Sequence, residues 1–427
     1  MKKHIFRLLT LLLITTLCLP SFSSCALFSN REFWSGDYRY TVANKQVTIT
    51  EYTGFATNVT IPESIRKMPV VAIDDTAFHG CDHIESITIP DSVVSIGGLA
   101  FSECHSLERV TLGKGIREID YSPFAFCDKM IYNIYDNGCY VGNDENPYFA
   151  LICTTSEEIE SITIHPDTVV VAGSAIESCK LLREITFPDG IVSIGSFALQ
   201  YCSALETVNI PKSLESLGTL VFLECSSIQN FVVSNENANF KAVDGSLFSH
   251  DGTRLIKYAA GRKDTSYSVP DGAVIIERSA FEKALHLTEV TLPDSVEEIG
   301  HMAFIHCENM QSIHLGNSLK TIDGAAFSYC TSLSQITIPD STQKLSYSLF
   351  SYCDKLESVI IGSGVVSIEE DAFTGCNSLR EVVFRNPAGW KVKTMFALTS
   401  TAVNVSNPEQ NAHYLKDQYK NYYWLKK

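Results

Sequence analysis

The sequence is poor in positive charge. Its 427 residues include 33 Lys and Arg against 49 Asp and Glu, which gives a net charge of −16. Without residues 1–24 the count becomes 30 against 49, a net charge of −19. Nucleic acid and anionic membrane surfaces both bind proteins through clustered Lys and Arg. We therefore expect neither as a partner of the folded chain. The acidic surplus mainly indicates a soluble surface.

The sequence also lacks the short motifs that carry common chemistries. It contains no Gly-x-Ser-x-Gly elbow, no glycine-rich phosphate loop and no dinucleotide fingerprint. The acidic cluster Asp144-Glu145-Asn146 lacks the spaced oxygen ligands of a calcium loop. Two acids suited to glycoside hydrolysis could always be found among 49, so their presence decides nothing. We expect no cofactor, no metal and no catalysis.

Long apolar runs are absent except near the start. Residues 8–19 are apolar, follow Lys2, Lys3 and Arg7, and are too few to span a bilayer permanently, which indicates an export signal. Ser23, Ser24 and Cys25 then resemble the cleavage site of a bacterial lipoprotein, although Phe22 stands where Leu is usual. The resemblance implies a signal peptide over residues 1–24 and a membrane anchor through lipid on Cys25. Ordinary secretion is the alternative.

Cysteine is abundant in the chain and recurs at one fixed interval. Ten of the fourteen cysteines fall into three series spaced 23 residues apart, and Phe stands three residues before most of them. An aliphatic side chain or Met stands three residues after each. A fixed period of this length is typical of stacked repeats. Because no Cys-x2-Cys pair occurs and the neighbours are apolar, we expect buried structural thiols rather than zinc ligands. The series are Cys81, Cys104, Cys127; Cys179, Cys202, Cys225; and Cys307, Cys330, Cys353, Cys376.

Each period contains one short strand. Alternating apolar residues such as Ile87 and Ile89 predict a strand with one buried face, and Pro90 ends it because proline lacks the N–H of a ladder. Fourteen such positions occur between residues 59 and 384. Stacked at the usual spacing, they predict a parallel sheet roughly 60–70 Å long. Its solvent face should be mainly Ser, Thr and Glu.

The repeating unit, Leu-x-x-Ile-x-Ile-Pro-x-Ser-Val-x-x-Ile-Gly-x-x-Ala-Phe-x-x-Cys, resembles the BspA-type leucine-rich repeat of bacterial surface antigens. The resemblance implies a β-rich solenoid over residues 59–385 and a secreted or surface-anchored protein. The repeat itself implies no binding residue. Residues 25–35 would form a tether, 36–58 an N-terminal cap, and 386–427 a C-terminal cap with an aromatic-rich helix over residues 408–427.

Two stretches, about residues 135–158 and 236–262, interrupt the period and predict hairpin insertions. Insertions emerge from one face of a solenoid and often bind partners. We therefore expect the binding residues among their aromatics, which are Tyr140, Tyr148, Phe248 and Tyr258. Cys139 and Cys153 flank the first turn, and we hypothesise that they form a disulfide.

Taken together, the sequence predicts a monomeric, lipid-anchored surface protein that binds an extracellular protein or glycan. A structural spacer of an envelope assembly is the second hypothesis, and an enzyme is the third. Exposed aromatic side chains gathered on one face would favour the binding protein. A uniformly polar surface would favour the spacer.

Overall fold

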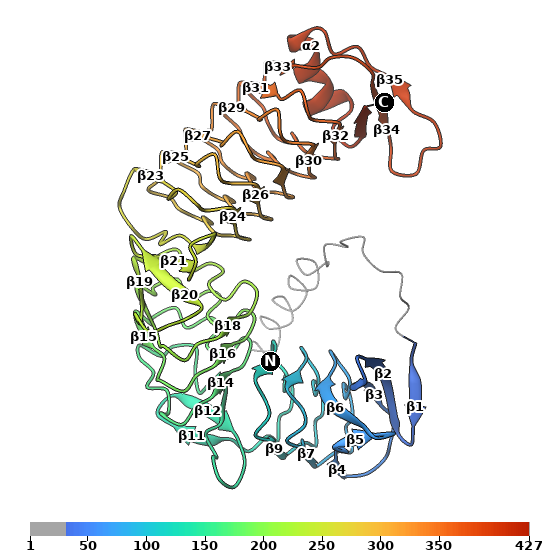
Figure 1. Ribbon diagram of the computed structural model, residues 1–427, viewed down its shortest axis with the longest axis vertical. Coiled ribbons are helices and arrows are strands. Elements are labelled where there is room, and N and C mark those ends of the chain that lie inside the picture. The colour runs from blue at the N-terminus through green and yellow to red at the C-terminus, as the bar shows by residue number, and fades with distance from the viewer. Residues whose placement is uncertain (1–30, 427) are drawn as a thin grey trace.

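The protein is a solenoid of stacked coils, as predicted. A computed structural model describes residues 31–426. Figure 1 shows the coils following one another along a curved, C-shaped path. Most coils contribute one strand to each of two parallel ladders, and paired residues in neighbouring coils are 23 positions apart, as Ile87 and Val110 are. The core lies between the two ladders.

The outer ladder runs along the outer edge of the curve (Figure 1). It forms four separate three-stranded parallel sheets rather than the single sheet predicted. It also has twelve strands and not fourteen, because the first insertion diverts the chain: Ile134 lies in an antiparallel hairpin, and Ile162 is buried without forming a strand. The twelve strands are β4 (Asn58–Thr60), β7 (Ser86–Thr88), β9 (Arg109–Thr111), β15 (Glu184–Thr186), β17 (Thr207–Ile210), β19 (Asn230–Val233), β23 (Ser266–Ser268), β25 (Glu289–Thr291), β27 (Ser312–His314), β29 (Gln335–Thr337), β31 (Ser358–Ile361) and β33 (Glu381–Phe384).

The inner ladder lines the concave edge and consists mostly of two-residue strands. Its Ile side chains point inward, and Ile96 and Ile299 are almost fully buried. Its strands are β6 (Met68–Ile73, with β5, Ser64–Ile65, beside it), β8 (Ser95–Ile96), β10 (Glu118–Ile119), β14 (Val170–Val171), β16 (Ser193–Ile194), β18 (Ser216–Leu217), β24 (Ile275–Ile276), β26 (Glu298–Ile299), β28 (Thr321–Ile322), β30 (Lys344–Leu345) and β32 (Ser367–Ile368).

Phenylalanine rings stack through the interior from coil to coil. The rings of Phe304 and Phe327 lie 5.3 Å apart and nearly parallel, and those of Phe327 and Phe350 lie 5.5 Å apart. Such offset stacking adds to the free energy that burial alone supplies. The ten cysteines of the period are buried beside these rings, which confirms their structural placement.

The two insertions are hairpins, as predicted, and each adds antiparallel strands to the inner ladder. The first contains β11 (Asn133–Tyr135), β12 (Gly138–Val141) and β13 (Ala150–Thr154), and β13 then pairs in parallel with β14. The second contains β20 (Phe240–Val243), β21 (Ser246–Ser249) and β22 (Arg254–Lys257), and β22 pairs with β24. Asp244 and Gly245 both have positive φ, which the tight turn between β20 and β21 requires.

A buried ion pair lies where the second insertion breaks the stacking, and its carboxylate links the two halves of the solenoid through a hydrogen bond. Lys257 Nζ lies 3.2 Å from Glu282 Oε2, and the two side chains are 6% and 3% exposed. The Glu282 carboxylate also accepts the backbone N–H of Glu224, 58 residues earlier. In regular coils that N–H donates to a carbonyl of the next coil, as Tyr201 does to Leu223. Glu282 therefore replaces a backbone acceptor that the insertion removes.

Both ends of the solenoid are covered. At the N-terminus, β1 (Phe33–Ser35), β2 (Tyr38–Ala43) and β3 (Gln46–Tyr52) form an antiparallel meander that continues the inner ladder. At the C-terminus, α2 (Pro408–His413) leads into a π-helical turn, η1 (Tyr414–Gln418). The predicted helix does not extend to residue 427, because β36 (Tyr423–Lys426) is a strand that closes the ladder against β32. β34 (Trp390–Lys393) and β35 (Thr401–Ala402) pair beyond it.

Candidate binding surface

Three of the four aromatic residues predicted to bind a partner are buried instead. Tyr140, Phe248 and Tyr258 are 0%, 1% and 1% exposed, so that prediction is wrong for them. The hairpin strands extend the inner ladder and turn these side chains into the core. Tyr258 stacks on Phe281 at 5.0 Å and takes the place of the repeat's phenylalanine. The spacing in the sequence indicated this burial, because Tyr258 precedes Phe281 by one full period of 23 residues.

The fourth residue, Tyr148, is half-buried in an aromatic cluster of the first insertion. Its ring stacks on His165 at 4.0 Å and meets Tyr135 and Tyr140 edge to face. The His165 backbone N–H also donates to the Tyr140 hydroxyl at 3.2 Å. These rings contact one another and hold the insertion on the solenoid, so we assign them a packing role.

Cys139 and Cys153 face each other across β12 and β13. They are directly paired in the antiparallel register, immediately before a β-bulge. A hydrogen bond from the Cys153 thiol lowers the pKa of Cys139. The two sulfur atoms are therefore brought together, as the sequence suggested, and the disulfide stays a prediction. Cys25, the predicted lipid attachment site, lies outside the described residues.

The solvent face of the outer ladder is polar, as predicted. Thr88, Arg109, Glu289 and Gln335 all point outward and are exposed, whereas inward residues such as Ile87, Val290 and Ile336 are buried. Other side chains of this face form hydrogen bonds along the ladder, such as that from the Asn209 side-chain amide to Thr186 Oγ1 at 3.0 Å. Within residues 31–426 this face offers mainly polar contacts, with Val232 of β19 as an exposed apolar exception at 50%.

An exposed column of aromatic rings, not foreseen from the sequence, lies on the side of the solenoid that carries the Phe-x-x-Cys loops. The rings of His306 and Tyr329 stack at 4.5 Å, and those of Tyr329 and Tyr352 at 4.8 Å. Tyr329 and Tyr352 are 37% and 46% exposed. Neither tyrosine hydroxyl has a hydrogen-bond partner within residues 31–426. We call His306, Tyr329 and Tyr352 the aromatic column.

The backbone of the repeat creates this column. His306, Tyr329 and Tyr352 have φ of 58°, 60° and 61°, in the left-handed region that non-glycine residues seldom adopt. The same conformation recurs two residues after the phenylalanine position in other coils, for example at Glu103 and Tyr201. It therefore belongs to the fold and not to one strained site. It places every such side chain on the same side, where consecutive aromatic residues can stack.

A third exposed tyrosine lies on the same arc of the coil, closer to the inner ladder. Tyr347 is 44% exposed and its ring covers Gly324, where a Cβ would lie 2.5 Å from the tyrosine Cζ. The His301 ring lies 6.0 Å away, and the Arg278 guanidinium contacts His301 Nδ1 at 3.3 Å. Burial, together with the Arg278 charge, lowers the pKa of His301 to about 4, so that this imidazole is neutral at pH 7.

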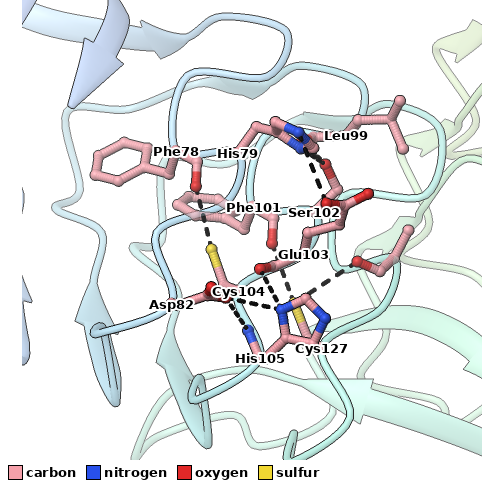
Figure 2. A network of polar contacts seen from close by, with 11 residues as sticks. Phe78, His79, Asp82, Leu99, Phe101, Ser102, Glu103, Cys104, His105 and Cys127 are labelled. Carbon is pink, nitrogen blue, oxygen red and sulfur yellow. Dashed lines mark hydrogen bonds and ion pairs between the residues drawn. The ribbon is translucent and has the colours of Figure 1, made fainter. Parts of the chain in front are cut away.

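The Phe-x-x-Cys loops contain a regular set of polar contacts, which Figure 2 shows in the N-terminal coils. The thiols of Cys104 and Cys127 donate to the carbonyl oxygens of Phe78 and Phe101 at 3.1 and 3.0 Å. His105 Nδ1 lies 2.7 Å from the Asp82 carboxylate. This contact raises the pKa of His105 and lowers the pKa of Asp82. These contacts link the loops of adjacent coils.

The described part of the chain offers little to a small ligand or a metal ion. Within residues 31–426 no group of three or more His, Cys, Asp and Glu side chains could hold a metal. Two shallow hollows have volumes of about 170 and 160 Å³, one lined by Asp74, Glu118 and Asp120 and the other by Lys416 and Asp417. Sites for drug-sized ligands are usually larger, about 300–1,000 Å³. No helix among these residues is long and apolar enough to cross a membrane.

Solved structures of other proteins share this architecture. A leucine-rich cell surface protein of Faecalibacterium prausnitzii is 29% identical, over 84% of this chain and 96% of that one, with a TM-score of 0.53. The pneumococcal vaccine antigen PcpA is 22% identical over 83% and 88% of the two chains, with a TM-score of 0.50. A leucine-rich repeat protein of Eubacterium ventriosum is 19% identical over 82% and 83%, with a TM-score of 0.51. The last two similarities concern the fold alone.

No curated protein matches the chain significantly. A family model does: the one described as "BspA type Leucine rich repeat region" matches residues 49–143, 152–266 and 260–380, in six copies. These matches cover well over half of the sequence and include the second hairpin insertion, while residues 144–151 of the first insertion lie between two matches. The chain therefore belongs to the family of proteins built from BspA-type leucine-rich repeats.

Proposed function

We propose that this protein is an exported, lipid-anchored surface protein that binds an extracellular protein and has no catalytic role. The observation that carries the proposal is the aromatic column of His306, Tyr329 and Tyr352, with Tyr347 on the same arc. Exposed tyrosines on a rigid scaffold are favoured anchors of protein interfaces, because they bury a large area at low entropic cost. A spacer without a ligand has no need of such a surface.

The arrangement of the rings favours a protein partner over a glycan. A sugar ring packs against the flat face of an aromatic side chain. In the column the faces contact one another, and a Cβ at Gly375 would lie 2.7 Å from Tyr352 Cδ1, so the last ring also has a neighbour on its far side. The ring edges and the hydroxyls of Tyr329 and Tyr352 are accessible to a partner. These groups suit the mixed apolar and hydrogen-bonded contacts of a protein interface.

Membership of the family, and the cell-surface description of the F. prausnitzii protein, support export to the surface. Lipid on Cys25 would hold the solenoid at the membrane, and residues 26–30 would precede the first cap. The substitution Cys25→Ala should move the protein from the membrane fraction to the soluble fraction of the cells or their medium. Unchanged fractionation of Cys25→Ala would count against the lipid anchor.

The partner can be sought by capturing extracellular matrix proteins, plasma proteins and glycans on immobilised residues 26–427. The variant Tyr329→Ser/Tyr352→Ser should lose the captured protein. A matched control replaces two exposed apolar residues outside the column, Val94 and Val366, which are 44% and 50% exposed. If the wild-type chain captures nothing, the spacer hypothesis is favoured, and if it captures only glycans, the proposed partner class is wrong.

A further inference from the structure

The C-terminal cap contains an exposed apolar loop between β34 and β35. Phe396 and Leu398 are 90% and 103% exposed, and Met395 is 53% exposed. Single exposed apolar residues are ordinary on a protein surface. Three of them within four residues, two with essentially the whole side chain in water, form a concentrated apolar tip. We call residues 395–398 the cap tip.

The cap tip projects from a firmly packed base. Trp390 on β34 and Trp424 on β36 are 2% and 1% exposed, and the Phe384 ring lies 5.1 Å from Trp390. The Trp390 indole N–H also donates to the Asn386 carbonyl oxygen at 3.1 Å. β34 pairs with β36 on one side and with β35 on the other. The exposure of Phe396 therefore does not come from a poorly packed cap.

The charge of this segment is opposite to that of the remainder. Residues 386–427 contain six lysines and two acids, a net charge of +4, which leaves −20 for residues 1–385. Trp390 and Val392 of β34 point into the core, so Lys391 and Lys393 lie on the outward face beside the cap tip. Within residues 31–426 neither lysine has an ion-pair partner. Two uncompensated positive charges thus adjoin an apolar tip.

We propose that the cap tip inserts into the headgroup region of a lipid bilayer that contains anionic phospholipids, with Lys391 and Lys393 contacting the phosphates. Apolar side chains flanked by lysine are the pattern that binds the interface of such membranes. A protein partner would have to enclose Phe396 and Leu398 in a pocket, whereas a bilayer surrounds a protruding tip without one. The −20 charge elsewhere would repel the same surface, so the chain should approach it end-on through the C-terminal cap.

The test is sedimentation of residues 26–427, made without lipid, with vesicles of phosphatidylglycerol and phosphatidylcholine or of phosphatidylcholine alone. We expect binding to the anionic vesicles that weakens with salt. The variant Phe396→Ser/Leu398→Ser should bind at least about tenfold more weakly. Lys391→Ser/Lys393→Ser should bind about 25-fold more weakly, at about fivefold per lysine.

Phe55→Ser is the matched control, because Phe55 is also 90% exposed but lies far from the cap in sequence. It should leave vesicle binding unchanged, as should Tyr329→Ser/Tyr352→Ser, which separates this proposal from the protein-binding one. The proposal is overturned if the wild-type chain does not bind anionic vesicles. It is equally overturned if Phe396→Ser/Leu398→Ser binds them as tightly as the wild type.

Discussion

The thiol of Cys330 donates a hydrogen bond to the carbonyl oxygen of Phe304 in the preceding coil, over 3.2 Å. The same bond links Cys307 to Phe281 and Cys376 to Phe350, each time across 26 residues. Burial raises the pKa of the Cys307 thiol to about 12, so the group stays protonated and able to donate. The repeated cysteine is therefore a hydrogen-bond donor between coils as well as a small buried side chain.

Replacing one of these cysteines should lower the free energy of unfolding by more than the lost side-chain volume alone predicts. Cys330→Ala leaves the Phe304 carbonyl without its thiol donor and opens a small cavity, and we expect it to lower the free energy of unfolding by about 1–2 kcal/mol. The natural Ala284 occupies the same position opposite Tyr258. Ala284→Cys should stabilise the chain by up to about 1 kcal/mol if the thiol reaches the Tyr258 carbonyl. Urea unfolding of both variants measures these effects, and equal stability of all three proteins would refute the role of the thiol.

The buried pair of Lys257 and Glu282 should control the coupling of the two halves. Glu282→Ala removes the counter-charge of the buried Lys257 ammonium, which keeps only its hydrogen bond to the Ser279 carbonyl oxygen, and leaves the Glu224 N–H without its acceptor. We therefore expect the free energy of unfolding to fall by about 3–5 kcal/mol. Breaking an exposed pair with Glu297→Ala, which frees Lys320, should cost less than about 1 kcal/mol. Denaturant unfolding of Glu282→Ala should also separate into two transitions. A single transition with a loss as small as that of Glu297→Ala would contradict this role.

The register of β12 and β13 makes the predicted disulfide between Cys139 and Cys153 directly testable. Peptide mapping of the exported protein without reduction should recover the two cysteines in one linked pair. Because the bond would close a loop of about 15 residues, its reduction should lower the free energy of unfolding by about 3 kcal/mol. Cys139→Ala/Cys153→Ala should show no response to reductant. Full alkylation of both thiols in the untreated protein would rule the bond out.

The period of 23 residues was enough to predict the solenoid, because each position recurs in a fixed environment. Cys330, Phe327 and Leu333 are all buried as their spacing required. The outer ladder has fewer strands than predicted. At Ile162 the side chain is buried, as the pattern required, although its backbone is not in a strand. A pattern of apolar residues reports burial more directly than it reports hydrogen bonding between strands.

The binding surface could not be inferred in the same way. Tyr140 and Phe248 looked exposed because insertions usually protrude, but both hairpins fold back into the inner ladder. Tyr329 and Tyr352 share the position two residues after phenylalanine, so the sequence contained their alignment. Their outward orientation depends on a left-handed backbone conformation. A tyrosine in the sequence does not indicate this conformation, because non-glycine residues seldom adopt it. Only the structure identifies them as a stacked, exposed pair.

The most direct test of the account is the affinity of residues 26–427 for the protein they capture, measured for the wild type and for Tyr329→Ser/Tyr352→Ser. If the aromatic column is the binding surface, the double substitution should raise Kd at least about thirtyfold, the effect of losing two tyrosine anchors. Val94→Ser/Val366→Ser should leave Kd within about a factor of two. An unchanged Kd in the tyrosine variant, with circular dichroism showing a native fold, would contradict the central claim.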